Sequence, residues 1–375
     1  MIGGLAAFLA LISFVVAHEA GHYFAAKATG MKVTEFFIGF GPRIWSFRRG
    51  ETEYGIKPIP FGAYVKVVGM SHIEDVAPED EGRTYRDKPF WAKSLVVLSG
   101  VGANFLLAFL IFSSLALWEG RPIIVDGEPV LTTSVEAVVP ESDGKPTAAA
   151  LAGIEAGDRI VAVDGVTIED WAVLTESLAG RPGEDVTITV ERGTEQLTLQ
   201  ATLGERKNPD TGEVVGFLGI APAIQMESLN VFQAAGLGGR QVVAAVPLTL
   251  QSFGQLFRFD TIATLIRGLS GAEIPDDSRP VSPVGIVQIG SQATEFGIGN
   301  FVAMLAIINV FLGTLNVIPL FPLDGGHFAV AVYEKLTGRR ANMDKLIPVA
   351  VTVIIIIGAI GLLAIALDIV NPIDL

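Results

Sequence analysis

Long apolar stretches separated by polar regions dominate the pattern along this chain, and four of them have the length of a membrane span. A helix needs about 20 apolar residues to cross a bilayer, and the second and fourth stretches contain no charged residue. The first lacks a basic start and a cleavage site, so we expect a retained span and not a removed signal peptide. The pattern predicts about four transmembrane helices, over Ile2–Phe24, Leu95–Trp118, Phe301–Phe321 and Leu346–Leu367.

The regions between these stretches have other patterns. Residues 31–68 combine β-forming residues with turn residues and are too interrupted to span a membrane, which predicts β-hairpins against the cytoplasmic leaflet. A free strand edge there can capture an extended peptide; the alternative is a hairpin that only packs on the first helix.

Leu229–Phe257 is apolar in patches around Arg240, which predicts an amphipathic helix on the outer surface, not a fifth span. Gly268–Pro283 is expected to be a loop.

Composition agrees with a membrane protein. Half of the residues are hydrophobic and only 18% are charged, and the mean hydropathy of +0.51 is far above that of a soluble domain. The chain contains no cysteine, which excludes disulfides and cysteine-based nucleophiles or metal sites.

Charge predicts the orientation in the membrane. Residues 25–94 carry eleven Lys or Arg against nine Asp or Glu, whereas residues 121–297 carry eleven against twenty-four. The short loop 322–345 is also basic. By the positive-inside rule, 25–94 and 322–345 are cytoplasmic, while 121–297 and both termini lie outside. The net charge of −14 therefore belongs mostly to the exterior region, and it argues against nucleic acid as a partner.

The first apolar stretch carries the motif His18-Glu19-Ala20-Gly21-His22. Residues four apart lie on one face of a helix, so both imidazoles can reach one metal ion with Glu19 beside it. Ionisable residues inside a transmembrane helix are costly and indicate function. HExxH is typical of zinc hydrolases, so we expect a catalytic zinc site here.

A catalytic zinc usually takes three protein ligands and leaves a fourth position for water. The better candidate for the third ligand is Asp324, because Asn316 and two prolines interrupt the third apolar stretch beside it, and broken helices at membrane depth line protein-packed or wet sites. His72 and His327 remain possible. The other interpretation of this stretch is an ordinary span end followed by a turn.

Together, HEAGH in the first span and NVIPLFPLDGG in the third resemble the bacterial site-2 protease family of intramembrane zinc metalloproteases. Gly39-Phe40-Gly41-Pro42 and Pro283-Val284-Gly285-Ile286 are similar to further family motifs, and Ser282 is a departure where many members have glycine. The resemblance implies that His18, His22 and Asp324 bind Zn²⁺ and that Glu19 is the catalytic acid/base.

The resemblance also bears on substrate binding. It implies that Asn316 handles the substrate backbone, and its amide could also stabilise an oxyanion; the alternative is that Asn316 only satisfies carbonyls freed by Pro319. We expect further substrate contacts from the motif after the first span, at Gly39, Phe40, Gly41 and Pro42.

The exterior region resembles one PDZ domain. The run from Ala152 to Gly165 fits the pattern AGxxxGDxIxxVxG, and the loop before it is a few residues longer than in the family. A weaker match to the carboxylate-binding strand of a permuted PDZ domain gives the expected groove residues Gly216, Phe217, Leu218 and Gly219.

These observations predict a multi-pass α-helical membrane protein with about four transmembrane helices, a membrane-associated β-hairpin region and one extracytoplasmic PDZ-like α+β domain. The expected segments are 1–26 (first helix), 27–94 (cytoplasmic hairpins and loop), 95–118 (second helix), 125–222 (PDZ), 223–297 (amphipathic helix and loop), 298–326 (third helix) and 346–371 (fourth helix).

The expected function is zinc-dependent cleavage of transmembrane segments at the cell membrane. By resemblance, the substrates are single-pass proteins already trimmed by an upstream protease, such as anti-sigma factors or remnant signal peptides. A membrane-anchored PDZ adaptor is the alternative, but the complete metal motifs speak against it. A metal transporter would be expected to have inverted repeats, which the sequence does not indicate.

Overall fold

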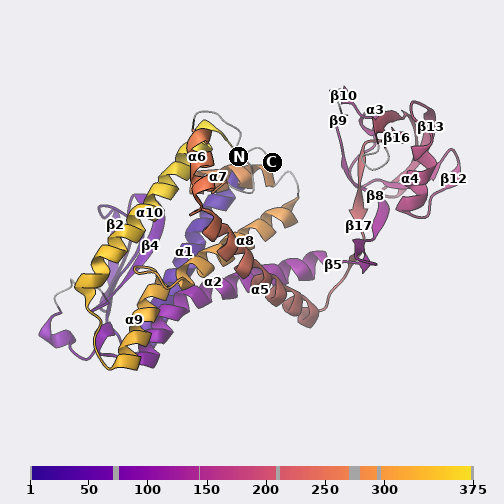
Figure 1. Cartoon of the computed structure of the whole chain (residues 1–375). Coiled ribbons are helices and arrows are strands. Elements are labelled where there is room, and N and C mark those ends of the chain that lie inside the picture. Colours follow the sequence, from indigo (N-terminus) through magenta and orange to yellow (C-terminus); the bar gives the residue numbers. More distant parts are fainter. Residues whose placement is uncertain are drawn as a thin grey trace. The chain divides into compact units, whose positions relative to one another are not determined.

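The computed structural model describes residues 2–70, 76–142, 144–207, 212–269, 279–293 and 297–372. The chain divides into two compact units, one formed by residues 1–118 and 230–375 and the other by Glu119–Leu229. Figure 1 follows the chain through both, and each is described by itself below.

The first unit is mainly helical. Four of its described helices are long and apolar enough to cross a membrane: α1 (Ile2–Ala28), α2 (Phe90–Glu119), α8 (Ile298–Val317) and α10 (Asp344–Val370 as a span, within Met343–Val370). Each overlaps a stretch expected from the sequence. The remaining helices of this unit are η1 (Pro78–Asp80), η2 (Tyr85–Asp87), α5 (Val231–Gln255), α6 (Phe259–Gly268), α7 (Pro283–Ala293) and α9 (Asp324–Thr337).

The third apolar stretch is broken where the prolines predict. α8 ends at Val317, and the chain makes no helix until α9 begins at Asp324. Pro319 and Pro322 lie in the break and lack the backbone donors that a continuous helix needs. The expected segment 298–326 is therefore one span followed by the first turn of a separate helix.

A four-stranded sheet follows α1. It consists of β1 (Val33–Phe40), β2 (Trp45–Arg49), β3 (Thr52–Ile56) and β4 (Ile59–Val67), in the order β2-β3-β1-β4. Only β2 and β3 form a simple hairpin; β3 then pairs parallel with β1, placing Phe36 opposite Tyr54. β4 pairs antiparallel with the other side of β1 and is an edge strand. The inner face closes a core with α1 and α2 that includes Ala26, Met31, Val33, Val67, Val96 and Val97.

α5 packs against two of the spans, α2 and α8. Its Gly238 faces Ser113 of α2 so closely that a Cβ would lie 2.3 Å from the serine oxygen, and small residues of this kind let helices approach in a membrane. A core shared by α2, α5 and α8 contains Ala108, Phe112, Val242, Val246, Ala306 and Val310. The helix predicted over 229–257 is thus present, and the sequence did not predict this packing.

α7 packs against the first half of α1, where Gly4 and Gly290 bring the two backbones together. The start of α7 is held by Asp368 of α10, which is fully buried. Its carboxylate accepts hydrogen bonds from the backbone N–H groups of Ser282 (2.9 Å) and Gly285 (3.1 Å). Arg279 pairs with the same carboxylate at 3.0 Å. Ser282, the departure noted above, accepts hydrogen bonds from the first N–H groups of α7.

The second unit is an α+β structure. Its main sheet has the order β14-β13-β11-β8-β17, with β12 paired to β11, and α3 and α4 pack on it around a core that includes Ile160, Leu174, Ile188 and Val190. The principal elements are β8 (Leu131–Val138), α3 (Ala148–Ala152), β11 (Arg159–Val163), β12 (Val166–Thr167), α4 (Trp171–Ala179), β13 (Asp185–Arg192), β14 (Glu195–Thr202) and β17 (Ile220–Ile224). Short strands complete it: β5 (Arg121–Pro122), β6 (Ile124–Val125), β7 (Glu128–Pro129), β9 (Glu141–Ser142), β10 (Lys145–Pro146), β15 (Gly204–Lys207), β16 (Val214–Phe217) and β18 (Met226–Glu227).

A buried ion pair ties this unit together. Asp158 accepts two hydrogen bonds from the Arg192 guanidinium, at 2.7 and 2.8 Å, and one from the N–H of Glu155. The Arg192 hydrogen bonds hold the pKa of Asp158 below its usual range. Bidentate pairing of this kind fixes the geometry of the turn before β11.

Candidate metal centre

Two histidines from α1 and one aspartate from α9 converge on one point. His18 Nε2 lies 3.0 Å from Asp324 Oδ2, and His22 Nε2 lies 3.3 Å from the same oxygen. The two Nε2 atoms are 3.1 Å apart. Both histidines are only 7% exposed. Residues separated by more than 300 positions in sequence thus form one compact group of metal-ligating atoms, all within 4.8 Å.

α1 places Glu19 next to this group. Since His18 and His22 share one helix face, Glu19 projects from the adjacent position, where the backbone N–H of Val65 in β4 donates to its Oε2 at 3.0 Å. The edge strand of the sheet therefore fixes the orientation of this carboxylate.

The contact of α1 with α2 orients His22. Its Nδ1 lies 2.7 Å from the carbonyl oxygen of Val96, and because a carbonyl only accepts, Nδ1 carries the proton. Nε2 then holds a lone pair, the state that ligates metals. Gly100 lies directly under the imidazole, where a Cβ would be 2.4 Å from Nε2, and Gly21 meets Ser99 in the same way at 2.3 Å.

The glycines after Asp324 explain how the carboxylate reaches this place. A Cβ on Gly325 would lie 2.0 Å from the carbonyl oxygen of Val317, and one on Gly326 would lie 2.4 Å from the N of Phe321. Only glycine allows α9 to begin so close to the end of α8. In the Leu-Asp-Gly-Gly run, the two glycines therefore allow α9 to pack against the end of α8, and this packing places the Asp324 carboxylate at the site.

The group of donors fits a zinc ion. Two imidazole nitrogens and a carboxylate oxygen approach one another. His22 Nε2 brings a lone pair because the His22 proton is on Nδ1, and the buried Asp324 Oδ2 has no hydrogen-bond partner among the described residues. Lone pairs that face one another in a buried site repel, and a bound cation would remove this repulsion. Two nitrogens and one oxygen are the ligands of catalytic zinc sites that keep a fourth position for water or substrate.

Comparison with known proteins agrees with this chemistry. Residues 6–360 match peptidase family M50, the site-2 protease family. The chain belongs to this family. As an M50 peptidase it is an intramembrane zinc metalloprotease, a metalloendopeptidase that uses Zn²⁺.

Relatives of the M50 chain extend over almost its full length. Zinc metalloprotease Rip1 of Mycobacterium bovis is 33% identical over 98% of this chain and 97% of the relative. Zinc metalloprotease RasP of Shouchella clausii is 27% identical over 91% and 92%. Among solved structures, the PDZ domain of the SdrC-like protein of Listeria monocytogenes matches with 20% identity and a TM-score of 0.19, over 27% of this chain and 94% of that one.

The other residues expected at the site have different positions. The Asn316 side chain donates to the carbonyl of Leu312 in its own helix at 3.1 Å, and its contact with substrate stays a prediction. The His327 ring meets Phe321, with centroids 4.7 Å apart, and the residue lines a cavity whose lining does not include His18, His22 or Asp324. His72 lies outside the described residues.

The motif after the first span makes a chain reversal in the sheet. Gly39 and Gly41 have φ values of +87° and +101°, which favour glycine. Gly39 packs on the carbonyls of Lys57 and Ile59. Phe40, at the end of β1, stacks on Tyr64 of β4, and Pro42 follows in the exposed turn. Their contact with substrate stays a prediction.

In the second unit, the predicted groove residues line a cavity of about 380 Å³ between α4 and the β16–β17 segment. The lining includes Trp171, Leu174, Leu178, Gly216, Phe217, Leu218 and Gly219. Gly219 has φ of +92° and packs on Thr147, which explains why glycine stands here.

The sequence reasoning missed the groups that orient the site, namely the N–H of Val65, the carbonyl of Val96, and Gly100. Two are backbone atoms and leave no residue-type signal. Gly100 did leave one, because small residues in an apolar span mark close helix contacts.

Proposed function

We propose that this M50 peptidase cleaves transmembrane segments of single-pass membrane proteins, with His18, His22 and Asp324 holding the zinc and Glu19 moving the proton. The convergence of the three ligating atoms beside Glu19 carries the proposal. The position of His18, Glu19 and His22 on α1, a helix of membrane length, supports a substrate that lies in the bilayer.

The reaction divides between the metal and Glu19. Zinc, when bound, supplies Lewis-acid activation of water and of the scissile carbonyl. Glu19 accepts the proton from the attacking water and delivers it to the leaving amine nitrogen. The hydrogen bond from Val65 N–H keeps one carboxylate oxygen fixed, so the other oxygen is free for the proton transfer.

A peptide bond in a transmembrane helix is shielded by its helical hydrogen bonds, so the substrate has to be extended before attack. β4 is an edge strand, and its Val65 reaches Glu19. An extended substrate segment pairing with this edge would lie next to the catalytic carboxylate. In the alternative, the sheet only supports α1, with which it shares a core.

The substrate class and the orientation follow from the resemblance and from charge. We propose that the substrates are anti-sigma factors, remnant signal peptides or similar proteins that an upstream protease has already trimmed. In the cell membrane, the basic segments 25–94 and 322–345 lie on the cytoplasmic side. The acidic second unit, which we propose to be a PDZ domain, lies on the outer side.

Membrane proteomics tests the proposed substrate class. Cells with the wild-type enzyme are compared with cells carrying Glu19→Gln. Truncated single-pass fragments that retain their transmembrane segment should accumulate in the variant alone. Equal amounts of such fragments in both strains would refute it.

Gly100 provides a test of the ligand role of His22. Gly100→Ala should weaken zinc affinity by about 10–100-fold, the effect of disturbing a group that orients a ligand, because the new Cβ would lie 2.4 Å from His22 Nε2. Zinc content after dialysis against graded chelator measures it. Gly102→Ala on the same helix is the matched control, since nothing lies within 4 Å of its Cβ position. Equal zinc retention in both variants would contradict the ligand assignment.

The second unit is expected to exclude bulky substrates. Replacing residues 119–229 with a flexible Gly/Ser linker should permit cleavage of a substrate that retains its folded exterior domain, while the trimmed substrate is still cut. Cleavage of full-length and trimmed substrates, measured side by side, checks this. Continued rejection of the full-length substrate would eliminate the gate. Reduced cleavage of the trimmed substrate would instead indicate that the groove captures its new carboxyl terminus.

A further inference from the structure

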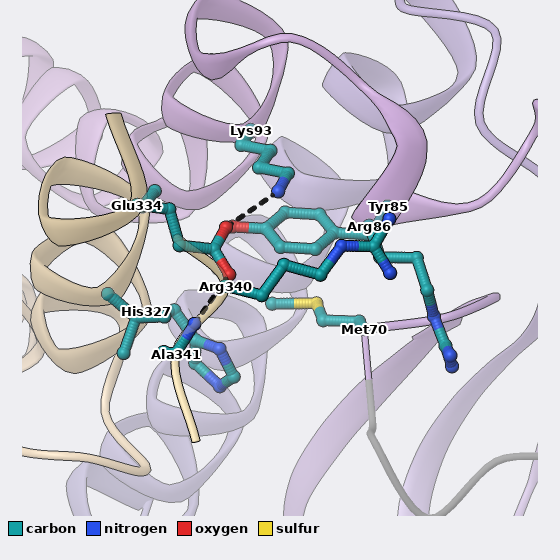
Figure 2. Close-up of a pocket in the computed structure, with 10 residues that line it drawn as sticks. Met70, Tyr85, Arg86, Lys93, His327, Glu334, Arg340 and Ala341 are labelled. Atoms are coloured by element: carbon teal, nitrogen blue, oxygen red, sulfur yellow. Dashed lines mark hydrogen bonds and ion pairs between the residues drawn. The ribbon is translucent and has the colours of Figure 1, made fainter. Parts of the chain in front are cut away.

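A second cavity, separate from the metal centre, lies against α9. It has a volume of about 190 Å³, smaller than the roughly 300–1,000 Å³ of sites for drug-sized ligands, so it suits a compact chemical group. Figure 2 shows side chains converging on it from η2, from the start of α2, from α9 and from the segment after α9. Its polar lining comprises Tyr85, Arg86, Lys93, His327, Glu334 and Arg340.

The carboxylates near this cavity already accept hydrogen bonds from the protein. Glu334 Oε2 accepts from Lys93 Nζ at 2.9 Å, and Oε1 accepts from the backbone N–H of Ala341 at 3.2 Å. Asp87, which lies near enough to Arg340 to be influenced by its charge, is held by the Thr84 hydroxyl and the N–H of Gly82. Lys93 and Arg340 therefore line a cavity whose one carboxylate, that of Glu334, already accepts a hydrogen bond at each oxygen.

A hydrogen-bond donor of the lining side chains, in contrast, remains without a partner in the described part of the chain. Tyr85 is only 8% exposed, and its hydroxyl has no hydrogen-bond partner among the described residues. A buried polar group without a partner is unfavourable. Burial, followed by the charge of Glu334, raises the pKa of Tyr85, so the hydroxyl remains a donor at physiological pH.

Two cations add to this donor capacity. Lys93 is 12% exposed, keeps N–H groups beyond the one given to Glu334, and lies 5.7 Å from the centre of the Tyr85 ring. Arg340 makes no hydrogen bond or ion pair within the described ranges, and Figure 2 shows its side chain extended across the cavity toward Tyr85. A planar guanidinium in this position suits bidentate binding of an oxyanion.

We propose that this cavity binds a phosphate group, presented either by a soluble phosphomonoester or by the headgroup of an anionic phospholipid, with Tyr85, Lys93 and Arg340 as donors. A tetrahedral oxyanion offers acceptors to all three donors at once and balances the surplus positive charge. A cation or a neutral group with few acceptors would leave the buried Tyr85 hydroxyl without a hydrogen-bond partner.

The ligand would contact the helix that begins with Asp324. Val330, Ala331 and Glu334 of α9 line the cavity, two to three turns from the metal centre. Occupancy would stabilise α9 against α2, in addition to the Lys93–Glu334 ion pair, and is expected to protect the backbone amides of α9 from hydrogen exchange.

The test uses the zinc-loaded protein in phosphatidylcholine nanodiscs. One arm titrates glycerol 3-phosphate calorimetrically; the other counts retained phosphatidylglycerol against phosphatidylcholine by native mass spectrometry after partial delipidation. We expect one of these probes to bind at a single site. Tyr85→Phe and Arg340→Ala should each weaken that binding about tenfold or more, as expected for losing a hydrogen bond to a charged group.

Arg339→Ala is the matched control, because Arg339 is a neighbouring exposed cation that does not line the cavity. Its affinity should equal that of the wild type. The proposal is overturned if neither probe binds the wild-type protein at one site. It is also overturned if all three variants bind alike, which would indicate only general attraction to positive charge.

Discussion

Glu19→Gln is expected to leave zinc bound and to abolish peptide cleavage. The amide keeps the size of the side chain and can still accept the hydrogen bond from Val65 N–H, so α1 and the histidines should keep their positions. It cannot take up a proton, and losing a general base costs roughly 10²–10⁴-fold in rate. Zinc content by mass spectrometry and cleavage of a trimmed single-pass substrate in proteoliposomes measure the two effects.

The matched control is Glu136→Gln, which removes one exposed carboxylate from the second unit. It should retain both zinc and activity. Proteolysis by Glu19→Gln at the wild-type rate would refute the assignment of the base. A loss of zinc in this variant would instead mean that Glu19 is itself a ligand.

Asp324→Asn is expected to remove metal and activity together. Its Oδ2 is within 3.3 Å of the Nε2 atoms of His18 and His22, and a neutral amide is a poorer donor to a dication. Disturbing even a group that supports a ligand costs about 10–100-fold in metal affinity, so losing the charged ligand should cost at least that much. Zinc retained against a chelator, measured beside cleavage, checks the result.

Asp344→Asn is the control, since Asp344 is an exposed acid in the first turn of α10. If Asp324→Asn keeps zinc and cleaves normally, the third ligand lies elsewhere. Excess zinc should partly restore its activity but should not restore that of Glu19→Gln, which separates ligand from base.

Much of the helical framework could be predicted from the sequence. Membrane spans have a strong signal, because each needs a long apolar run, and the prolines correctly located the break after α8. The grouping of His18, His22 and Asp324 followed from helical spacing and from motif resemblance. Span ends were less accurate: α2 begins at Phe90, five residues before the expected start, because a helix continues past the apolar run into polar residues such as Lys93.

The arrangement of the sheet could not be predicted in the same way. The alternating pattern indicated strands, but the parallel pairing of β1 with β3 depends on how the β2–β3 hairpin folds back. The contact of Glu19 with Val65 follows from that pairing, because β4 reaches α1 only as the edge strand beside β1. Such long-range choices are decided by packing, which local sequence does not encode.

The contact between Asp368 and the start of α7 bears on the order in which the protein is made. α1, with the HExxH residues, is synthesised before α7, which packs against it, but the carboxylate that holds the N-terminus of α7 belongs to α10, which is made later still. Asp324 is likewise made late. A chain whose translation stops before Asp324 carries the two histidines and Glu19 without that carboxylate, and without the hydrogen bonds from Asp368 that hold α7. The group of His18, His22 and Asp324 can therefore assemble only after the chain has been made as far as α9.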